Sequence, residues 1–370
     1  MRINERASLW RRLQPYFVVF DAPLALIMFL LLSVGLVTLY SAGIDFPGRV
    51  EGQVRNILVA FLVMWMAATI PPQTLMRFAV PLYTVGVALL VAVFLFGSVK
   101  KGARRWLYVG IDFQPSEIMK IAMPLMLAWF FQQRAGMLRW HSFLIAALLL
   151  AVPVGLIAKQ PDLGTALLVL AAGFYVIFLA GLSWKMLIGL FVAAGASLPV
   201  VWSVLHDYQR ERVKMLIDPS SDPLGKGFHI IQSTIAVGSG GITGKGWLKG
   251  TQAHLEFIPE RTTDFIFAVY SEEFGLIGNL VLCLLYVLLV GRGLMIAANA
   301  PSLFTRLLAG SITMIFFTYA FVNMGMVSGI LPVVGVPLPF MSYGGTALLT
   351  LGLGAGILMS IARHRKLVQT

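Results

Sequence analysis

The chain has 370 residues, of which 58% are hydrophobic and only 12% are charged. Soluble domains average about 45–50% apolar and about 25% charged residues, so this composition excludes an ordinary soluble protein and predicts a polytopic membrane protein. The net charge is +12, but no basic domain stands apart from the apolar runs, which argues against nucleic acid as a partner. The single cysteine, Cys283, leaves no disulfide to form within the chain.

Apolar stretches long enough to cross a bilayer recur along the chain. A spanning helix needs about 20 apolar residues, and fewer where it is packed within protein. On this rule we predict ten spans, at about 22–42, 54–71, 75–98, 115–132, 142–158, 162–182, 185–205, 264–291, 304–329 and 343–362. An even number of spans puts the arginine-rich start and the basic tail 363–366 on one side, which we expect to be cytoplasmic. No cleavable signal peptide is expected. The prediction is one all-α membrane domain over residues 1–370.

Charge is distributed unevenly in this topology. Basic residues divide almost equally between the two sides, whereas most acidic residues lie in outer loops. Basic residues on the outer side run against the positive-inside tendency, which suggests an anionic ligand there. Ordinary solvated loop charge is the alternative explanation.

Several predicted helices begin with a similar polar pattern on the outer side. These starts are QPSE at 114–117, QPDLG at 160–164, the prolines before SYGG at 342–345, and Asp264. Proline is favoured in a first helical turn, and Ser or Asp there can accept hydrogen bonds from free amides. A group of helix N-termini on one face suits a phosphate. Taken singly, each proline could simply begin a helix.

Two segments are not expected to form ordinary spans. The stretch 328–345 is apolar but contains Pro332, Gly335, Pro337 and Pro339, which predicts a re-entrant or cavity-lining piece, because irregular backbone at membrane depth must be covered by protein or water. The outer loop 206–263 is the only sizeable polar segment. Loops of this length are usually functional or disordered, and its apolar alternation over 229–237 favours amphipathic order at the membrane surface.

Acidic residues gather where the eighth predicted span begins. Asp264 lies at the junction of loop and helix, Glu260 and Arg261 lie one turn earlier, and Glu272 and Glu273 follow within the apolar run. An ionisable group at bilayer depth costs about 2.5–3.5 kcal/mol on insertion scales, so this concentration predicts a reaction centre. The alternative is that Asp264 only caps the helix. Glu117 and Lys120 share a helical face and could be functional or could simply pair.

Cofactor motifs are weak in this sequence. The glycines between 238 and 246 follow no strand and lack the register of a phosphate-binding loop, so tight turns explain them better than a nucleotide. The five histidines never pair at metal-ligand spacing, which argues against zinc. We expect no nucleotide, haem or zinc. A divalent cation, magnesium or manganese, between carboxylates and a substrate phosphate stays open.

Ordered motifs over nearly the whole chain resemble the SEDS family (shape, elongation, division and sporulation), and most of all its elongation-specific branch. The motifs are KGARRW at 101–106, QPSE at 114–117, QPDLGTA at 160–166, HDYQRERV at 206–213, the stretch 222–252 ending in GWLKGTQ, the stretch around Asp264, and LPVVGVPLPFMSYGG at 331–345. One departure is Thr262, where the family usually has histidine. Position 262 is therefore not expected to supply an obligatory acid or base.

The resemblance implies a peptidoglycan glycosyltransferase that polymerises lipid II on the outer face of the bacterial cytoplasmic membrane during cell elongation. The family's essential aspartate corresponds to Asp264 and its loop glutamate to Glu260. We expect Asp264 to be a general base, because an attacking hydroxyl must lose its proton. Expected substrate-binding residues are Lys101, Arg104, Arg105, Glu117, Lys120, Asp162, Arg210, Arg212 and Ser342.

The family also implies a partner, a class B penicillin-binding protein with transpeptidase activity, together with other membrane proteins of the elongation complex. Two other functions remain open from the sequence. A lipid II flippase would explain a broken span and a buried Glu–Lys pair. A non-catalytic scaffold would need neither Asp264 nor Glu260.

Overall fold

The computed structural model of the protein describes residues 19–100, 103–108, 112–160, 162–204, 207–222, 227–255, 258 and 260–364. Each predicted span coincides with one long helix: α2 (Ala22–Ala42), α3 (Arg49–Thr69), α4 (Pro72–Phe96), α5 (Pro115–Gln133), α6 (Trp140–Lys159), α7 (Leu163–Leu179), α8 (Trp184–Val204), α12 (Ile266–Ala298), α13 (Leu303–Val327) and α14 (Gly345–His364). Within the described residues, seven of them are long and apolar enough to cross a membrane, namely α2, α3, α4, α6, α12, α13 and α14. The prediction of an all-α polytopic membrane protein is confirmed.

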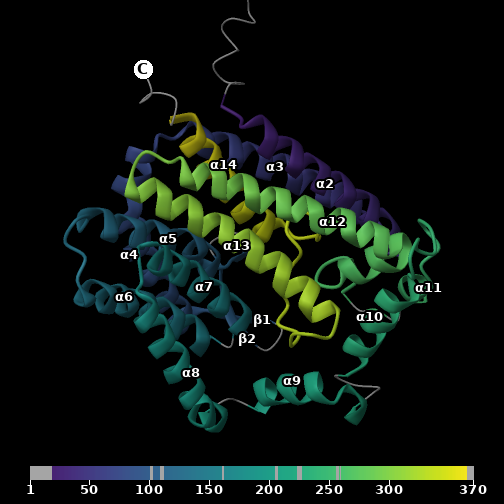
Figure 1. Ribbon diagram of the computed structural model, residues 1–370. Coiled ribbons are helices and arrows are strands. Elements are labelled where there is room, and N and C mark those ends of the chain that lie inside the picture. Colours follow the sequence, from purple (N-terminus) through teal and green to yellow (C-terminus); the bar gives the residue numbers. More distant parts are fainter. Residues whose placement is uncertain are drawn as a thin grey trace, which may run out of the picture.

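The helices form one bundle. In Figure 1, α2, α3 and α14 lie along one side, α12 and α13 cross the middle, and α4 to α8 lie on the other side. The start of α2 and the end of α14 lie near each other, away from α10 and α11, which agrees with an even number of crossings (Figure 1). We call the end of the bundle where α12 begins the loop end.

Close backbone contact joins α3 to α14. A Cβ atom at Gly356 would lie 2.3 Å from the carbonyl oxygen of Met64, and one at Gly352 would lie 2.9 Å from that of Ala60. The two glycines are four residues apart on one helical face, the small-residue spacing that lets membrane helices approach closely. This contact fixes α3 against α14.

Helix α12 is broken at Gly275, whose φ of 64° and ψ of −160° are not helical. Glycine allows this positive φ without a steric penalty. The glycine-rich loop after α10 (Phe228–Ser239) occupies the break. Four main-chain hydrogen bonds join them, from Leu276 to Gly241 (2.9 Å), Ile277 to Ile242 (3.1 Å), Lys245 to Glu272 (3.0 Å) and Gly246 to Glu273 (3.0 Å). The glycine-rich loop is therefore fixed to the main chain of α12 on both sides of the break.

The acids beside this break have structural partners. The Glu272 carboxylate accepts hydrogen bonds from Lys245 Nζ (2.6 Å) and from the N–H group of Thr251 (2.9 Å). Glu273 accepts hydrogen bonds from the Ser41 hydroxyl and from the N–H group of Leu248 (3.1 Å). Both acids are buried and hold the glycine-rich loop to α12. The prediction that they form one reaction centre with Asp264 was therefore wrong.

Residues 328–344 between α13 and α14, which we call the broken segment, are not helical, as predicted. Their carbonyl groups find side-chain donors within the bundle: the Tyr286 hydroxyl donates to Pro339 (2.7 Å), and the Asn323 amide donates to Val336 (2.7 Å). A Cβ atom at Gly35 of α2 would lie 2.7 Å from the Met341 Cα, so the segment is covered by protein. These partners satisfy backbone that has no helical hydrogen bonds.

Short elements lie between the long helices. Three strands, β1 (Ser98–Lys100), β2 (Ala103–Tyr108) and β3 (Asp112–Phe113), form an antiparallel sheet in the order β1-β2-β3, which the sequence did not predict. The long loop contains α9 (Asp207–Ile217), the 3₁₀ helix η1 (Pro219–Ser221), α10 and α11 (Thr251–His254). Ile230, Ser233 and Ala236 form the buried face of α10, which packs on α12, so the predicted amphipathic order is a helix.

Candidate functional site

Asp264 lies in the loop that precedes α12, at the loop end of the bundle. The N-cap of α12 is Phe265, and the helix has no side-chain cap, so Asp264 does not act as the N-cap. The Asn323 amide on α13 donates to the main-chain carbonyl of Asp264 (2.8 Å). On the other side, a Cβ atom at Gly335 would lie 3.2 Å from Asp264 Oδ2. The aspartate is thus fixed between α13 and the broken segment.

The residues before Asp264 are held by the last residues of the broken segment, just before α14. The Ser342 hydroxyl donates to the carbonyl of Thr263 (2.6 Å) and accepts from the N–H group of Leu338 (2.7 Å). The N–H group of Tyr343 donates to the carbonyl of Thr262 (2.9 Å). Ser342 is only 5% exposed. Its hydroxyl is used within the protein, so its geometry fits a positioning residue better than the expected substrate contact.

Glu260 and Arg261 begin this loop with opposite exposures. Glu260 is exposed at a φ of 54°, and its Oε2 accepts a hydrogen bond from the Thr263 hydroxyl (2.9 Å). Arg261 is buried, donates through Nε to the carbonyl of Ala42 (2.9 Å) and pairs with Asp45. The loop that carries Asp264 is therefore tied to the connection between α2 and α3.

His229 faces the same loop from α10. Its ring stacks on Phe265, with centroids 6.0 Å apart and an angle of 23° between the planes. Burial lowers the pKa of His229, and the negative charge of Glu260 opposes this shift in part. A histidine with a lowered pKa is neutral at pH 7.

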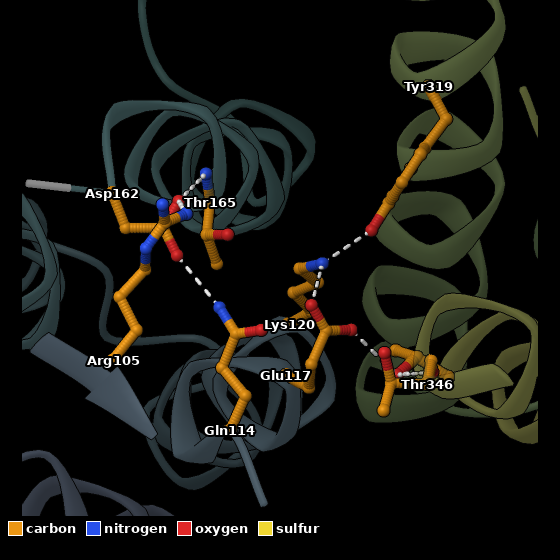
Figure 2. A network of polar contacts seen from close by, with 9 residues as sticks. Arg105, Gln114, Glu117, Lys120, Asp162, Thr165, Tyr319 and Thr346 are labelled. Carbon is orange, nitrogen blue, oxygen red and sulfur yellow. Dashed lines mark hydrogen bonds and ion pairs between the residues drawn. The ribbon is translucent and has the colours of Figure 1, made fainter. Parts of the chain in front are cut away.

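Figure 2 shows a buried polar network on α5. Lys120 Nζ donates to Glu117 Oε1 (2.6 Å) and to the Tyr319 hydroxyl on α13 (2.7 Å). The Thr350 hydroxyl on α14 donates to Glu117 Oε2 (3.1 Å). The structure thus brings the two predicted residues into a direct ion pair that joins three helices.

A second polar group lies beside the first, around the start of α7 (Figure 2). Asp162 Oδ2 accepts a hydrogen bond from the side-chain amide of Gln114 (2.8 Å), and its Oδ1 accepts from the N–H group of Thr165 (3.3 Å). Arg105 Nη1 lies 3.6 Å from Asp162 Oδ1. The starts of α5 and α7 and one arginine of β2 therefore meet at the loop end, as predicted from the shared helix-start pattern.

Helix α13 connects the α5 network with Asp264. Tyr319, which binds Lys120, and Asn323, which binds the Asp264 carbonyl, are four residues apart and share one helical face. One turn of α13 therefore separates the buried cation from the main chain of the aspartate.

The other predicted residues are placed differently. Lys101 and the side chain of Arg104 lie outside the described part of the chain. Arg210, on α9, donates to the carbonyls of Trp202 (2.9 Å) and Ser203 (2.7 Å) at the end of α8. Arg212 is an exposed residue of α9. Figure 1 shows α9 apart from the helical bundle, so these two arginines do not belong to the polar group on α5 and α7.

The cation expected from the sequence can be compared with the acidic and histidine side chains of the described residues. Within the described ranges no three or more His, Cys, Asp or Glu side chains form a cluster that could hold a metal ion. Magnesium binds through few protein ligands when substrate phosphates supply others. The described donors therefore do not form a ready metal site by themselves, and a substrate phosphate would have to supply further ligands.

Several residues of this site were missed in the sequence. Tyr319, Asn323 and Thr350 are isolated polar residues in apolar helices, where a polar side chain usually faces the bundle interior. That signal could have marked them as buried. Their partners come from other helices and could not be read from spacing.

Comparisons with known proteins agree with this architecture. The sequence profile of the FtsW/RodA/SpoVE family of cell cycle proteins matches residues 22–367. The peptidoglycan glycosyltransferase MrdB of Escherichia coli strain K12 is 52% identical over 350 residues, covering 94% of this chain and 95% of that protein. MrdB of Helicobacter pylori is 36% identical over 314 residues, covering 83% of this chain and 81% of its own.

Solved structures are similar over almost the full length. One similar chain comes from a peptidoglycan synthase complex whose structure concerns the coordination of polymerization and crosslinking. It aligns with a TM-score of 0.82 and 36% identity, covering 95% of this chain and 99% of that one. The rod shape determining protein RodA of Thermus thermophilus aligns with a TM-score of 0.70 and 30% identity, covering 95% and 98%. This chain therefore belongs to the FtsW/RodA/SpoVE family of cell cycle proteins, the SEDS family.

Proposed function

We propose that this protein is a peptidoglycan glycosyltransferase that polymerises lipid II during cell elongation. The observation that carries the proposal is its 52% identity, over 94% of the chain, to a protein named for that activity. The geometry supports it independently, because an acid at the loop end lies near buried cations and the starts of two helices. We place the protein in the bacterial inner membrane as one SEDS domain, with the loop end outside.

Asp264 is the proposed general base. The acceptor's 4-hydroxyl transfers its proton to the Asp264 carboxylate while its oxygen attacks the anomeric carbon of the donor. The bond from that carbon to the diphosphate oxygen breaks, and its electron pair leaves with the diphosphate. Direct displacement inverts the anomeric carbon. A base held in position contributes about 10²–10⁴-fold, and the hydrogen bond from Asn323 holds the main chain of Asp264 in place.

The departing diphosphate gains negative charge, so fixed donors near it stabilise the transition state. Arg105 is the best-placed described candidate, because its buried Nε has no hydrogen-bond partner among the described residues. The N-termini of α5 and α7 add partial positive charge beside it. Lys120 is buried, and its ammonium group is held by Glu117 and Tyr319. We therefore give the Glu117–Lys120 pair the role of shaping the site rather than binding phosphate by itself.

The donor's lipid chain has a candidate place on the bundle. An apolar groove of about 600 Å³ lies between α6, α7 and α8 and includes Phe143, Phe174 and Leu190. Helix α8 is exposed over most of its length. An undecaprenyl-diphosphate donor fits this combination of an apolar groove and a polar loop end. We propose a class B penicillin-binding protein as the partner that crosslinks the product.

Polymerisation by purified protein tests the proposal. With lipid II in detergent, wild-type protein should make glycan chains that are resolved on a gel, and addition of the transpeptidase partner should increase their amount. Asp264→Asn should abolish the chains, whereas the control Asp218→Asn, in the exposed η1 cap of the long loop, should not.

The same assay separates the other two functions. A flippase makes no chains in detergent, where there is no bilayer to cross. A scaffold tolerates Asp264→Asn and Glu260→Gln whenever partner binding survives. A folded Asp264→Asn protein that still polymerises lipid II would defeat the assignment.

A further inference from the structure

Arg49 is a cation beside the Asp264 loop that has no acidic partner among the described residues. It is the first residue of α3, and its guanidinium carbon lies 4.6 Å from the centroid of the Tyr343 ring and 5.3 Å from that of Phe46. No carboxylate in the described ranges lies within ion-pair distance of it. The Arg49 guanidinium instead packs against these two aromatic rings.

Arg261 provides a contrast within the same cluster. Its guanidinium carbon lies 5.1 Å from the centroid of the same Phe46 ring, but it is buried, pairs with Asp45 and donates to the carbonyl of Ala42. The charge of Arg261 is therefore balanced by a structural partner. Arg49 is only half-buried, and no carboxylate among the described residues balances its charge.

Two connections place Arg49 next to the Asp264 loop. Its neighbour Tyr343 donates a main-chain hydrogen bond to Thr262 (2.9 Å), two residues before Asp264. The end of α2 and the loop from Gly43 to Gly48, which precede Arg49, are tied to Arg261 through Ala42 and Asp45, respectively.

The face of α3 around Arg49 keeps the Tyr343 ring in place. A Cβ atom at Gly52 would lie 3.1 Å from the Tyr343 hydroxyl oxygen, and the Gln53 side chain donates to the carbonyl of Ser342 (3.0 Å). A guanidinium against a fixed ring loses less conformational entropy on binding, and its N–H groups still point outward in its plane. Those N–H groups match phosphate oxygens and can bind them in pairs.

We propose that Arg49 binds the diphosphate group of a polyprenyl-linked substrate at the loop end. This inference rests on the proposed function for the identity of the lipid, and the diphosphate belongs to either the donor or the acceptor. Phe46 and Tyr343 set the orientation of the guanidinium, and Arg49 supplies charge and hydrogen bonds to the phosphate oxygens.

Direct binding measures this role without catalysis. Undecaprenyl diphosphate and undecaprenol are titrated against full-length protein in detergent, using wild type, Arg49→Gln, Arg49→Lys and the control Arg55→Gln, an exposed arginine of the same helix. We expect Arg49→Gln to weaken diphosphate binding by about 10- to 100-fold, as the loss of charge-assisted hydrogen bonds implies. Arg49→Lys should lose less, Arg55→Gln should match wild type, and undecaprenol should bind all four proteins equally.

The outcomes separate this inference from its alternatives. Equal diphosphate affinity in Arg49→Gln and wild type overturns it. So does a fall in melting temperature with equal loss of diphosphate and undecaprenol binding, which would show a structural role. If wild-type protein makes no glycan but Arg49→Gln selectively loses diphosphate binding, the proposed function fails and this inference stands.

Discussion

Replacement of Asn323 by leucine tests whether the hold on the Asp264 main chain matters for activity. The Asn323 amide is fully buried and donates to the carbonyls of Asp264 (2.8 Å) and Val336 (2.7 Å). A buried carbonyl left without a donor costs about 1–3 kcal/mol, so two cost about 2–6 kcal/mol. Asn323 Oδ1 has no hydrogen-bond partner among the described residues, and its removal offsets about 1–3 kcal/mol of this. The net destabilisation should be about 1–3 kcal/mol.

The kinetic effect should exceed what this loss of stability explains. A displacement of about 1 Å at a reacting group can cost about 100-fold, so we expect kcat for lipid II polymerisation to fall about 10- to 100-fold with KM little changed. Melting temperature and single-turnover polymerisation are measured on the same preparation. The control Asn299→Leu, at the exposed end of α12, should change neither. An Asn323→Leu protein with a lowered melting temperature and wild-type kcat would refute the reasoning.

Three further predictions concern other parts of the molecule. Glu117→Gln leaves the Lys120 ammonium buried without its carboxylate, so thermal melts should show that the free energy of unfolding falls by about 3–5 kcal/mol. Adding Lys120→Met should restore at least half of this stability. A Glu117→Gln protein that melts like wild type would argue against the importance of the pair. Gly155→Trp fills open space in the apolar groove and should raise KM several-fold for a full-length polyprenyl substrate only, whereas an equal change with a short-chain analogue would exclude the groove. Burial lowers the pKa of His229, so the folded state binds a proton less readily than the unfolded state, and the free energy of unfolding should fall as the pH drops below the ordinary pKa of 6.5. His229→Gln should reduce the change in melting temperature between pH 8 and pH 5, and an unchanged pH dependence would contradict this.

The sequence predicted the helical bundle well, because hydrophobic length is a direct physical requirement of the bilayer. The broken segment was also predictable, since Pro332, Pro337 and Pro339 cannot continue a helix. The three short strands were missed because a few residues with no clear alternation carry little signal.

The candidate site could be predicted only in part. Spacing alone placed Glu117 beside Lys120, and the structure confirms that pair. Spacing could not assign Glu272 to Lys245, because that contact depends on how the glycine-rich loop returns to α12. Arg49 was missed for a related reason: in the sequence it is one of many basic residues in the predicted outer loops, and only tertiary contact with Tyr343 makes it distinctive.

The break at Gly275 divides α12 into two parts with different surroundings. Residues 266–273 are all buried, whereas much of the following part, including Leu276, Leu280 and Leu284, is exposed on the bundle surface. Helices in contact with lipid tilt to match the thickness of the hydrocarbon layer. Because the glycine-rich loop hydrogen-bonds to the main chain on both sides of Gly275, it fixes the angle between the lipid-facing part and the buried turns next to Asp264. A tilt of the lipid-facing part should therefore be transmitted to the aspartate, which couples its position to the thickness of the surrounding bilayer.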